Sequence, residues 1–212
     1  MSRNRVLPRC ERCLMHTPLC LCDDLPRIEA AARVTLVAHA AEWRRFSNTG
    51  RVAVLALEGA ELAVWGVRDQ PLDPATLVRE AERTVLLYPS EDAPRLVPTD
   101  ARPVRVLVPD GTWRESRRIA SRLAPLPGIE KVRVDAAARP GLRAAPSAGR
   151  LGTGEAIAAA LEALGDRDAA AQLREAVRTM VERALYVRGK IGHDRVRGGV
   201  PLEVRRALSE PR

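Results

Sequence analysis

The sequence has almost no lysine, no long apolar run and no cysteine outside one short segment. Lys131 and Lys190 are its only lysines, so arginine supplies nearly all of the positive charge. No apolar stretch reaches the roughly 18 to 20 residues that a membrane-spanning helix needs. The first ten residues, MSRNRVLPRC, lack the apolar segment of a secretory signal. We therefore expect a cytoplasmic protein that does not bind a membrane.

Positive charge exceeds negative charge in this chain. Its 212 residues include 35 basic and 27 acidic side chains, which gives a formal net charge of +8. Such a surplus favours an acidic partner, most often nucleic acid, although genome composition alone can enrich arginine. The charge alone is equally consistent with RNA binding and with an ordinary solvated surface. The length fits one compact domain with a sizeable core.

All four cysteines lie within thirteen residues, in the pattern C-x2-C-x6-C-x-C. They are Cys10, Cys13, Cys20 and Cys22. In a reducing compartment, two closely spaced pairs of thiolates are typical of a tetrahedral zinc site. His16, in the intervening loop, is a less favoured ligand, and unrelated thiols or a redox pair are the alternative. We expect a structural zinc ion, because four thiolates leave no open position for chemistry.

Apolar runs and helical patterns alternate along the rest of the chain. We expect strands at 33–39, 61–67, 83–89, 104–109 and 131–135, and helices at 50–60, 73–82, 113–124, 155–164 and 168–187. Residues 47–49, Asp73 and Thr153 are suited to cap the helices that follow them. The alternation predicts an α/β domain with a mostly parallel sheet and flanking helices.

The chain divides into three parts by composition. We expect a cysteine-rich zinc segment at 1–30, the α/β domain at 31–190 and a basic tail at 191–212 that frays. Residues 136–154 are rich in Pro, Gly and Ala and read as a long irregular loop. Long loops inside compact domains are often functional.

Polar residues follow three of the expected strands, in the segments 39–53, 86–94 and 107–118. The carboxyl ends of parallel strands meet at one edge of a sheet, so these groups are expected to converge there. Asp110 is the most informative, because Pro109 cannot donate to the sheet and Gly111 permits a tight turn. The alternative is that Asp110, with Thr112, merely caps the next helix.

The polar groups after the other two strands are weaker indications of a ligand site than Asp110. One of Glu91 and Asp92 could hold an amine or a ribose hydroxyl, or both could belong to a surface turn. The segment FSNTGR at 46–51 could bind a carboxylate or phosphate through backbone N–H groups. It matches neither a Walker loop nor G-x-G-x-x-G, so binding by those mechanisms is unsupported.

Arginines recur at helical spacing after Trp113. Arg114, Arg117, Arg118 and Arg122 share one face of the expected helix. Like charges on one stripe repel one another unless anions neutralise them, and RNA phosphates would do so. A solvated face is the alternative.

Taken together, these segments resemble a known family. The D-x-T-W sequence at 110–113 follows SNTGR and YPSEDA and precedes LGTGEAIAAALE, with the cysteines in front. In this order the motifs resemble the DTW-domain family, the S-adenosylmethionine-dependent tRNA-uridine aminocarboxypropyltransferases, from about Cys10 to Val187. Two departures are a Gly-Thr-Gly where members often show Ser-Thr, and HAAEW without a proline after the histidine.

The resemblance implies a fold like that of the SPOUT class, with a knotted C-terminal half against which the cofactor sits. It implies transfer of the 3-amino-3-carboxypropyl group of S-adenosylmethionine to N3 of a uridine in tRNA, which leaves methylthioadenosine. Asp110 would remove the N3 proton or hold the ammonium group of the cofactor. Trp113 would stack on a base.

We assign roles to individual residues on this basis. The catalytic candidates are Asp110, Thr112 and Trp113. The cofactor-binding candidates are Ser47, Asn48, Thr49, Gly50, Glu91, Asp92, Pro109, Asp110 and Thr153. The RNA-binding candidates are Arg51, Arg114, Arg117 and Arg118. We expect tRNA as the partner, and no protein partner is implied. Two alternative functions remain: a zinc-containing RNA-binding protein without catalysis, and a knotted RNA methyltransferase.

Overall fold

Five parallel strands form the centre of the computed structural model, which describes residues 8–98, 103–135 and 151–209. The strands are β1 (Arg33–His39), β2 (Glu61–Trp65), β3 (Arg83–Leu87), β4 (Val104–Asp110) and β5 (Ile129–Val132). They lie in the order β2-β1-β4-β3-β5, and every neighbouring pair is parallel. The predicted α/β fold with a mostly parallel sheet is therefore confirmed.

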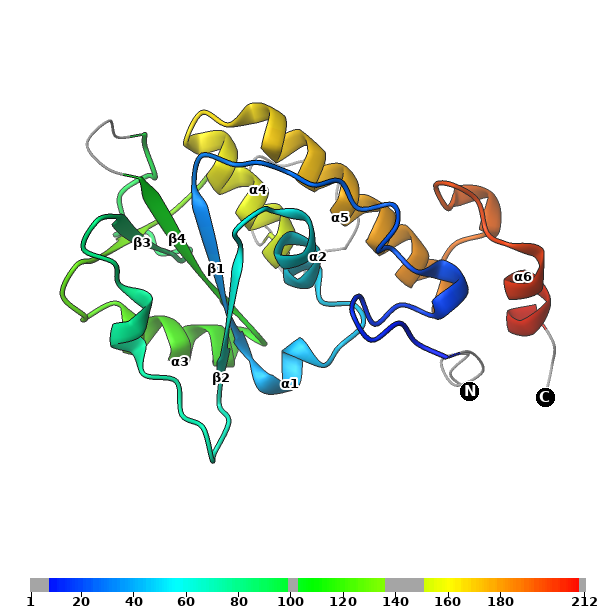
Figure 1. The fold of residues 1–212 in the computed structure, drawn as a ribbon, viewed down its shortest axis with the longest axis horizontal. Helices are drawn as coiled ribbons and strands as arrows, with labels where there is room; N and C mark the ends of the chain where they lie inside the picture. Colours follow the sequence, from blue (N-terminus) through cyan, green and yellow to red (C-terminus); the bar gives the residue numbers. More distant parts are fainter. Residues whose placement is uncertain (1–7, 99–102, 136–150, 210–212) are drawn as a thin grey trace.

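Helices cover both faces of the sheet (Figure 1). They are α1 (Ala40–Trp43), α2 (Thr49–Ala56), α3 (Trp113–Leu123), α4 (Thr153–Ala163), α5 (Arg167–Val187) and α6 (Leu202–Ser209), with short 3-10 turns at Thr17–Leu19, Pro74–Leu77 and His193–Arg195. Helices α2, α4 and α5 pack together over one face, and α3 packs on the other. In the described part of the chain, no helix has both the length and the apolar character needed to cross a membrane.

Alternation along β4 decides which side chains face which layer. Val106 and Val108 join the core beneath α2, α4 and α5, whereas Leu107 joins the core beneath α3. Successive side chains in a strand point to opposite faces. Asp110 therefore follows Val106 and Val108 and lies on the side of α2 and α4.

Three expectations about local structure are wrong. Residues 73–82 form only the turn Pro74–Leu77, since Leu77 is the turn's one buried residue and so short a helix gains little from packing. The last strand is Ile129–Val132 rather than 131–135, in register with β3. The tail does not fray at 191–209, because Val204 and Leu208 of α6 are buried in the main core.

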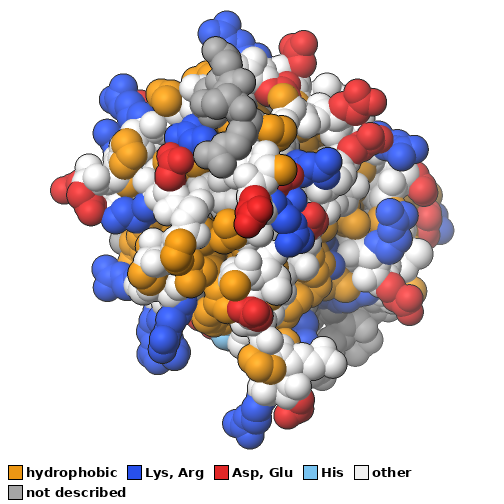
Figure 2. Space-filling model, turned by 60° about the vertical axis from the view of Figure 1, so that its left-hand side comes forward, with side chains coloured by type: hydrophobic (Ala, Val, Ile, Leu, Met, Phe, Trp, Pro, Cys, Tyr) orange, Lys and Arg blue, Asp and Glu red, His pale blue; other side chains and the backbone are white. Residues whose placement is uncertain are grey.

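The surface mixes both signs of charge on the face in Figure 2. Basic and acidic side chains alternate there around apolar groups near the centre. The loop expected at 136–154 falls mainly on residues 136–150, which lie outside the described ranges.

Candidate active site and metal centre

The carboxyl ends of β1 and β4 form the centre of the candidate site. The two strands are neighbours, with Ala38 opposite Asp110. The chain that leaves β1 forms α2 on one face, whereas the chain that leaves β4 forms α3 on the other. Open α/β sheets bind ligands at such a point, because the diverging connections leave a crevice between them. This rule places the candidate site at the strand ends, between the loops that follow His39 and Asp110.

Asp110 joins three separate segments at this edge of the sheet. One carboxylate oxygen accepts a hydrogen bond from Nδ2 of Asn48 at 2.6 Å, and the other accepts one from the hydroxyl of Thr153. Asn48 caps α2, and Thr153 is the first residue of α4. The side chain of Asp110 is only 4% exposed. Two of the three segments that were expected to converge, 39–53 and 107–118, therefore meet at this carboxylate, and the third partner is Thr153 instead of a residue of 86–94.

A second contact holds the starts of α2 and α4 together. The hydroxyl of Thr49 accepts a hydrogen bond from the backbone N–H of Gly154 at 3.1 Å. A Cβ atom on Gly154 would lie 2.6 Å from the side chain of Val177 and 3.0 Å from the carbonyl of Thr49. Only glycine permits this approach. The two helix N-termini are therefore packed against each other beside Asp110.

The structure excludes the alternative that Asp110 caps a helix, and it shows that the expected cap at Thr153 is wrong. Thr112 caps α3 in a capping box with Glu115, whose carboxylate accepts a hydrogen bond from the Thr112 N–H at 2.7 Å. Asp110 is therefore not the cap. Gly152, not Thr153, occupies the cap position of α4, and the Thr153 hydroxyl is directed to Asp110 instead.

Burial dominates the electrostatics of Asp110. Burial raises the pKa of its carboxyl group above the ordinary value, while the hydrogen bonds from Thr153 and Asn48 and the charge of Arg51 act in the opposite direction. The N-termini of α2 and α4 also carry partial positive charge. A carboxyl group with raised proton affinity at the end of a parallel strand, where such sheets bind ligands, is a candidate functional group.

Aromatic and ionisable side chains line the rim of the same edge. Trp113 is 40% exposed, and its ring stacks on that of Tyr88 with centroids 5.7 Å apart and planes 21° from parallel. Nδ1 of His39 lies 3.3 Å from both the backbone N of Ala41 and a carboxylate oxygen of Glu115. The exposed ring of Trp113 offers a planar surface on which a ligand ring could stack.

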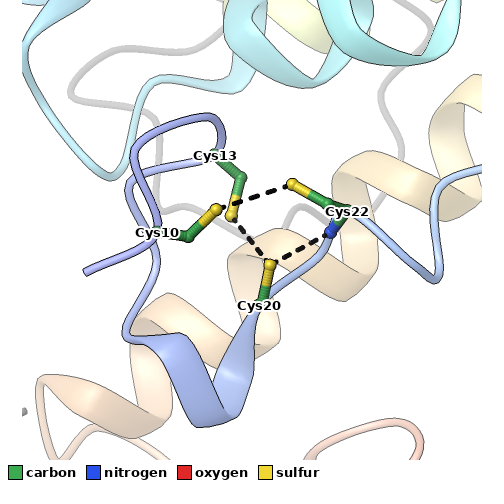
Figure 3. Close-up of side chains that lie close together, drawn as sticks. All are labelled: Cys10, Cys13, Cys20 and Cys22. Carbon is green, nitrogen blue, oxygen red and sulfur yellow. Dashed lines mark hydrogen bonds between the residues drawn. The ribbon is translucent and has the colours of Figure 1, made fainter. Parts of the chain in front are cut away.

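The four cysteines point toward one centre (Figure 3). All their Sγ atoms lie within 4.8 Å of one another, with Cys10 3.7 Å from Cys22 and Cys13 3.7 Å from Cys20. A tetrahedral zinc ion with Zn–S bonds of about 2.3 Å places its sulfurs about 3.8 Å apart. The donor set therefore fits zinc. Among the described residues, the group of metal-ligating side chains does not include His16.

The thiols differ in proton affinity before any metal binds. A backbone hydrogen bond from Cys13 lowers the pKa of Cys10 to about 6, whereas burial raises the pKa values of Cys20 and Cys22. Zinc binding requires all ligands as thiolates, so metal binding would release protons.

The cysteine segment is packed into the domain rather than appended to it. Met15 and Leu21 are buried in the same core as α5. Arg183 of α5 donates a hydrogen bond to the carbonyl of Cys20 at 2.5 Å and pairs with Asp24. Loss of the metal would therefore disturb the main core.

The model of the DTW domain matches residues 7–185, from before the first cysteine almost to the end of α5. The chain belongs to the DTW-domain family. Membership of this family is consistent with a role in tRNA modification. No solved structure matches the chain at a significant level.

Some residues of the DTW domain that were expected at the cofactor site lie elsewhere. Ser47 lines a different pocket, described below. Glu91 is exposed, and Asp92 accepts hydrogen bonds from the Ser90 hydroxyl and from Nζ of Lys131 at 3.1 Å. These bonds lower the pKa of Asp92 to about 2. Asp92 is thus oriented by Ser90 and by Lys131 of β5 rather than by the Asp110 cluster.

Arg51 is buried and joins two segments inside the DTW domain. Its side chain is 6% exposed, and its guanidinium lies 3.7 Å from the ring centre of Trp43. It donates hydrogen bonds to the carbonyls of Arg12, at 3.0 Å, and of Trp43. This burial argues against the expected RNA contact. The other three candidate RNA contacts are exposed on α3: Arg114, Arg117 and Arg118.

Sequence reasoning missed three side chains of the rim: His39, Tyr88 and Glu115. His39 is the last residue of β1, and Tyr88 directly follows β3. The strand-end rule that selected Asp110 would also have selected these two. Glu115 carried a weaker signal, as the third residue of a capping box that begins at Thr112.

Proposed function

We propose that this DTW-domain protein transfers the 3-amino-3-carboxypropyl group of S-adenosylmethionine to N3 of a uridine in cytoplasmic tRNA. A bond forms between N3 and the side-chain carbon next to the sulfonium. The bond between that carbon and sulfur breaks, and its electron pair stays on sulfur. The products are the modified uridine, 5′-methylthioadenosine and the N3 proton. The observation that carries the proposal is the buried Asp110 carboxylate where the DTW, SNTG and GTG segments meet.

The sulfonium sulfur bears three carbons that a nucleophile can attack, so the product depends on which carbon is held in line. Positioning alone can select it, because fixing two reactants in the reactive geometry removes much of the barrier. The close-packed starts of α2 and α4 support this role, since Asn48 and Thr153 are held rigidly by Asp110. A SPOUT-like knot in the C-terminal half is part of the proposal and rests on the family resemblance.

Asp110 has two candidate roles, which affect kcat and the affinity for S-adenosylmethionine differently. As a general base it would accept the N3 proton, and its raised pKa supports this role. As an orienting group it would hold the ammonium of the transferred chain by charge. Trp113, stacked on Tyr88, would then support the target base from the rim.

Asp110→Asn separates the two roles. The variant should fold, because its amide oxygen can accept from Asn48 and its NH2 group can donate to the Thr153 hydroxyl. Loss of a base lowers kcat by about 10²- to 10⁴-fold with unchanged affinity for S-adenosylmethionine in calorimetry. Loss of the ammonium contact weakens that affinity instead. Full activity, measured by mass spectrometry of tRNA nucleosides, would exclude both.

The nucleoside by-product tests the reaction itself. Chromatography after incubation with tRNA should detect 5′-methylthioadenosine. S-adenosylhomocysteine would instead identify a methyltransferase. The absence of both products, together with no heat on titration with S-adenosylmethionine, would identify an RNA-binding protein without catalysis.

A further inference from the structure

A pocket of about 520 Å³ lies where the cysteine segment, the loop between α1 and α2 and the C-terminal end of α5 meet. Its polar and aromatic lining consists of Arg9, Arg44, Arg45, Phe46, Ser47 and Arg188. Its volume falls within the range of roughly 300 to 1,000 Å³ that is usual for ligand sites. The proposed transfer reaction makes no use of it.

The pocket has an unbalanced positive charge. Four of its lining residues are arginines, and no carboxylate is among the described residues that line it. Arg45 pairs with Glu42 at 3.1 Å, but within the described ranges neither Arg44 nor Arg188 forms an ion pair. Like charges brought together in this way repel one another unless an anion lies between them.

The structure holds part of this charge in place before any ligand arrives. The guanidinium groups of Arg9 and Arg188 lie 4.6 Å and 5.3 Å from the ring centre of Phe46. Arg9 also donates a hydrogen bond to the carbonyl of Leu14 at 2.8 Å. A preorganised site binds more tightly, because less side-chain freedom is lost when the ligand is bound.

We propose that this pocket binds phosphate groups of the RNA backbone, an inference that rests on the proposed action on tRNA. The fork of a guanidinium matches the oxygens of a phosphate, and the hydroxyl of Ser47 adds a donor. Ser47 is followed directly by Asn48, which donates to Asp110. One loop therefore links the pocket to the site, so a phosphate held there would position the RNA strand relative to Asp110.

The pocket also differs from the face of the molecule shown in Figure 2. On the face in Figure 2, basic and acidic side chains are intermixed. The pocket instead gathers arginines from three segments that are far apart in the sequence. Concentrated charge of one sign attracts a polyanion more strongly than a mixed surface does.

Arg44→Glu and Arg188→Glu test the proposal, with Arg167→Glu as the matched control. Arg167 begins α5 and Arg188 follows its last residue, so the two lie about 30 Å apart on one helix of 21 residues. All three variants change the net charge equally. Binding of a tRNA transcript is measured by fluorescence anisotropy over a series of salt concentrations, and binding of S-adenosylmethionine by calorimetry.

Each pocket variant should weaken tRNA binding about tenfold and lower the slope of log K against log salt by about one. The control should change affinity less than threefold, and all variants should bind S-adenosylmethionine normally.

Pocket variants that bind tRNA as the control does would overturn the proposal. If inorganic phosphate binds the wild type in calorimetry while the pocket variants bind tRNA as the control does, the pocket is a site for free phosphate, which would also overturn the proposal. If the pocket variants fail to bind tRNA but the wild type yields no 5′-methylthioadenosine, the pocket stands and the proposed reaction fails.

Discussion

The hydroxyl of Thr153, on the first turn of α4, donates a hydrogen bond to Asp110 at the end of β4, 43 residues earlier in the chain. This bond satisfies one oxygen of a nearly buried carboxylate, and Asn48 satisfies the other. A buried carboxylate that loses such a donor is strongly penalised, because water cannot replace it. The pair therefore fixes where α4 begins relative to the sheet.

Thr153→Val should lower the free energy of unfolding by about 1 to 3 kcal/mol, because it leaves one oxygen of Asp110 without its donor. Valine keeps the γ-methyl that packs near Gly50. Urea unfolding measures the change, and Thr153→Ser should restore most of it. Thr179→Val is the control, since that hydroxyl bonds only to the Glu175 carbonyl of its own helix, and its effect should stay within about 0.5 kcal/mol. Equal stability of both valine variants would contradict the assigned bond.

The stability of the wild type relative to Asp110→Asn should fall as pH rises from about 4. The folded pKa of Asp110 is raised above its ordinary value of 3.8, so the folded state holds the proton more tightly than the unfolded chain. The stabilisation by protonation is complete below the unfolded pKa and is lost as pH rises through the folded pKa. Unfolding free energies of the two proteins, measured at a series of pH values, give the difference. A difference that grows with pH would mean that the folded pKa is lowered instead.

Metal removal should destabilise the whole domain rather than one segment. Elemental analysis should find about one zinc ion per chain, and a chelator should lower the unfolding free energy by several kcal/mol, because Met15 and Leu21 lie in the main core. Thermal unfolding followed by circular dichroism measures the loss. The control is Cys13→Ser, which should be destabilised already and should respond little to the chelator. A chelated protein with four titratable thiols and an unchanged Tm would refute a structural zinc.

Charge reversal on α3 should weaken tRNA binding independently of the arginine-lined pocket. Arg117→Glu and Arg118→Glu should each reduce the salt slope by about one, since both side chains are exposed. Combining Arg117→Glu with Arg188→Glu should multiply the separate losses, as expected for contacts that do not touch. An unchanged slope in both single variants would mean that this face of α3 is merely solvated.

Much of the fold could be predicted because it depends on local pattern. Apolar runs predicted four of the five strands within a few residues, and they placed Asp110 at the end of one of them. The cysteine spacing likewise predicted a cluster that the structure brings together. The short turn at 74–77 and the buried helix in the tail were not predicted, because contacts with distant segments decide whether each segment forms a stable helix.

The sequence by itself determined the α/β layers, the four-thiolate cluster and the position of Asp110 at a strand end, since each follows from the spacing of nearby residues. Only the tertiary structure decided that Asn48 and Thr153 meet at Asp110, and that Arg51 is a buried clamp while Ser47 turns to another pocket. The reason is physical: these contacts join residues 62 and 43 positions from Asp110. They form because β1 and β4 become neighbours in the folded sheet and because α4 packs against β4.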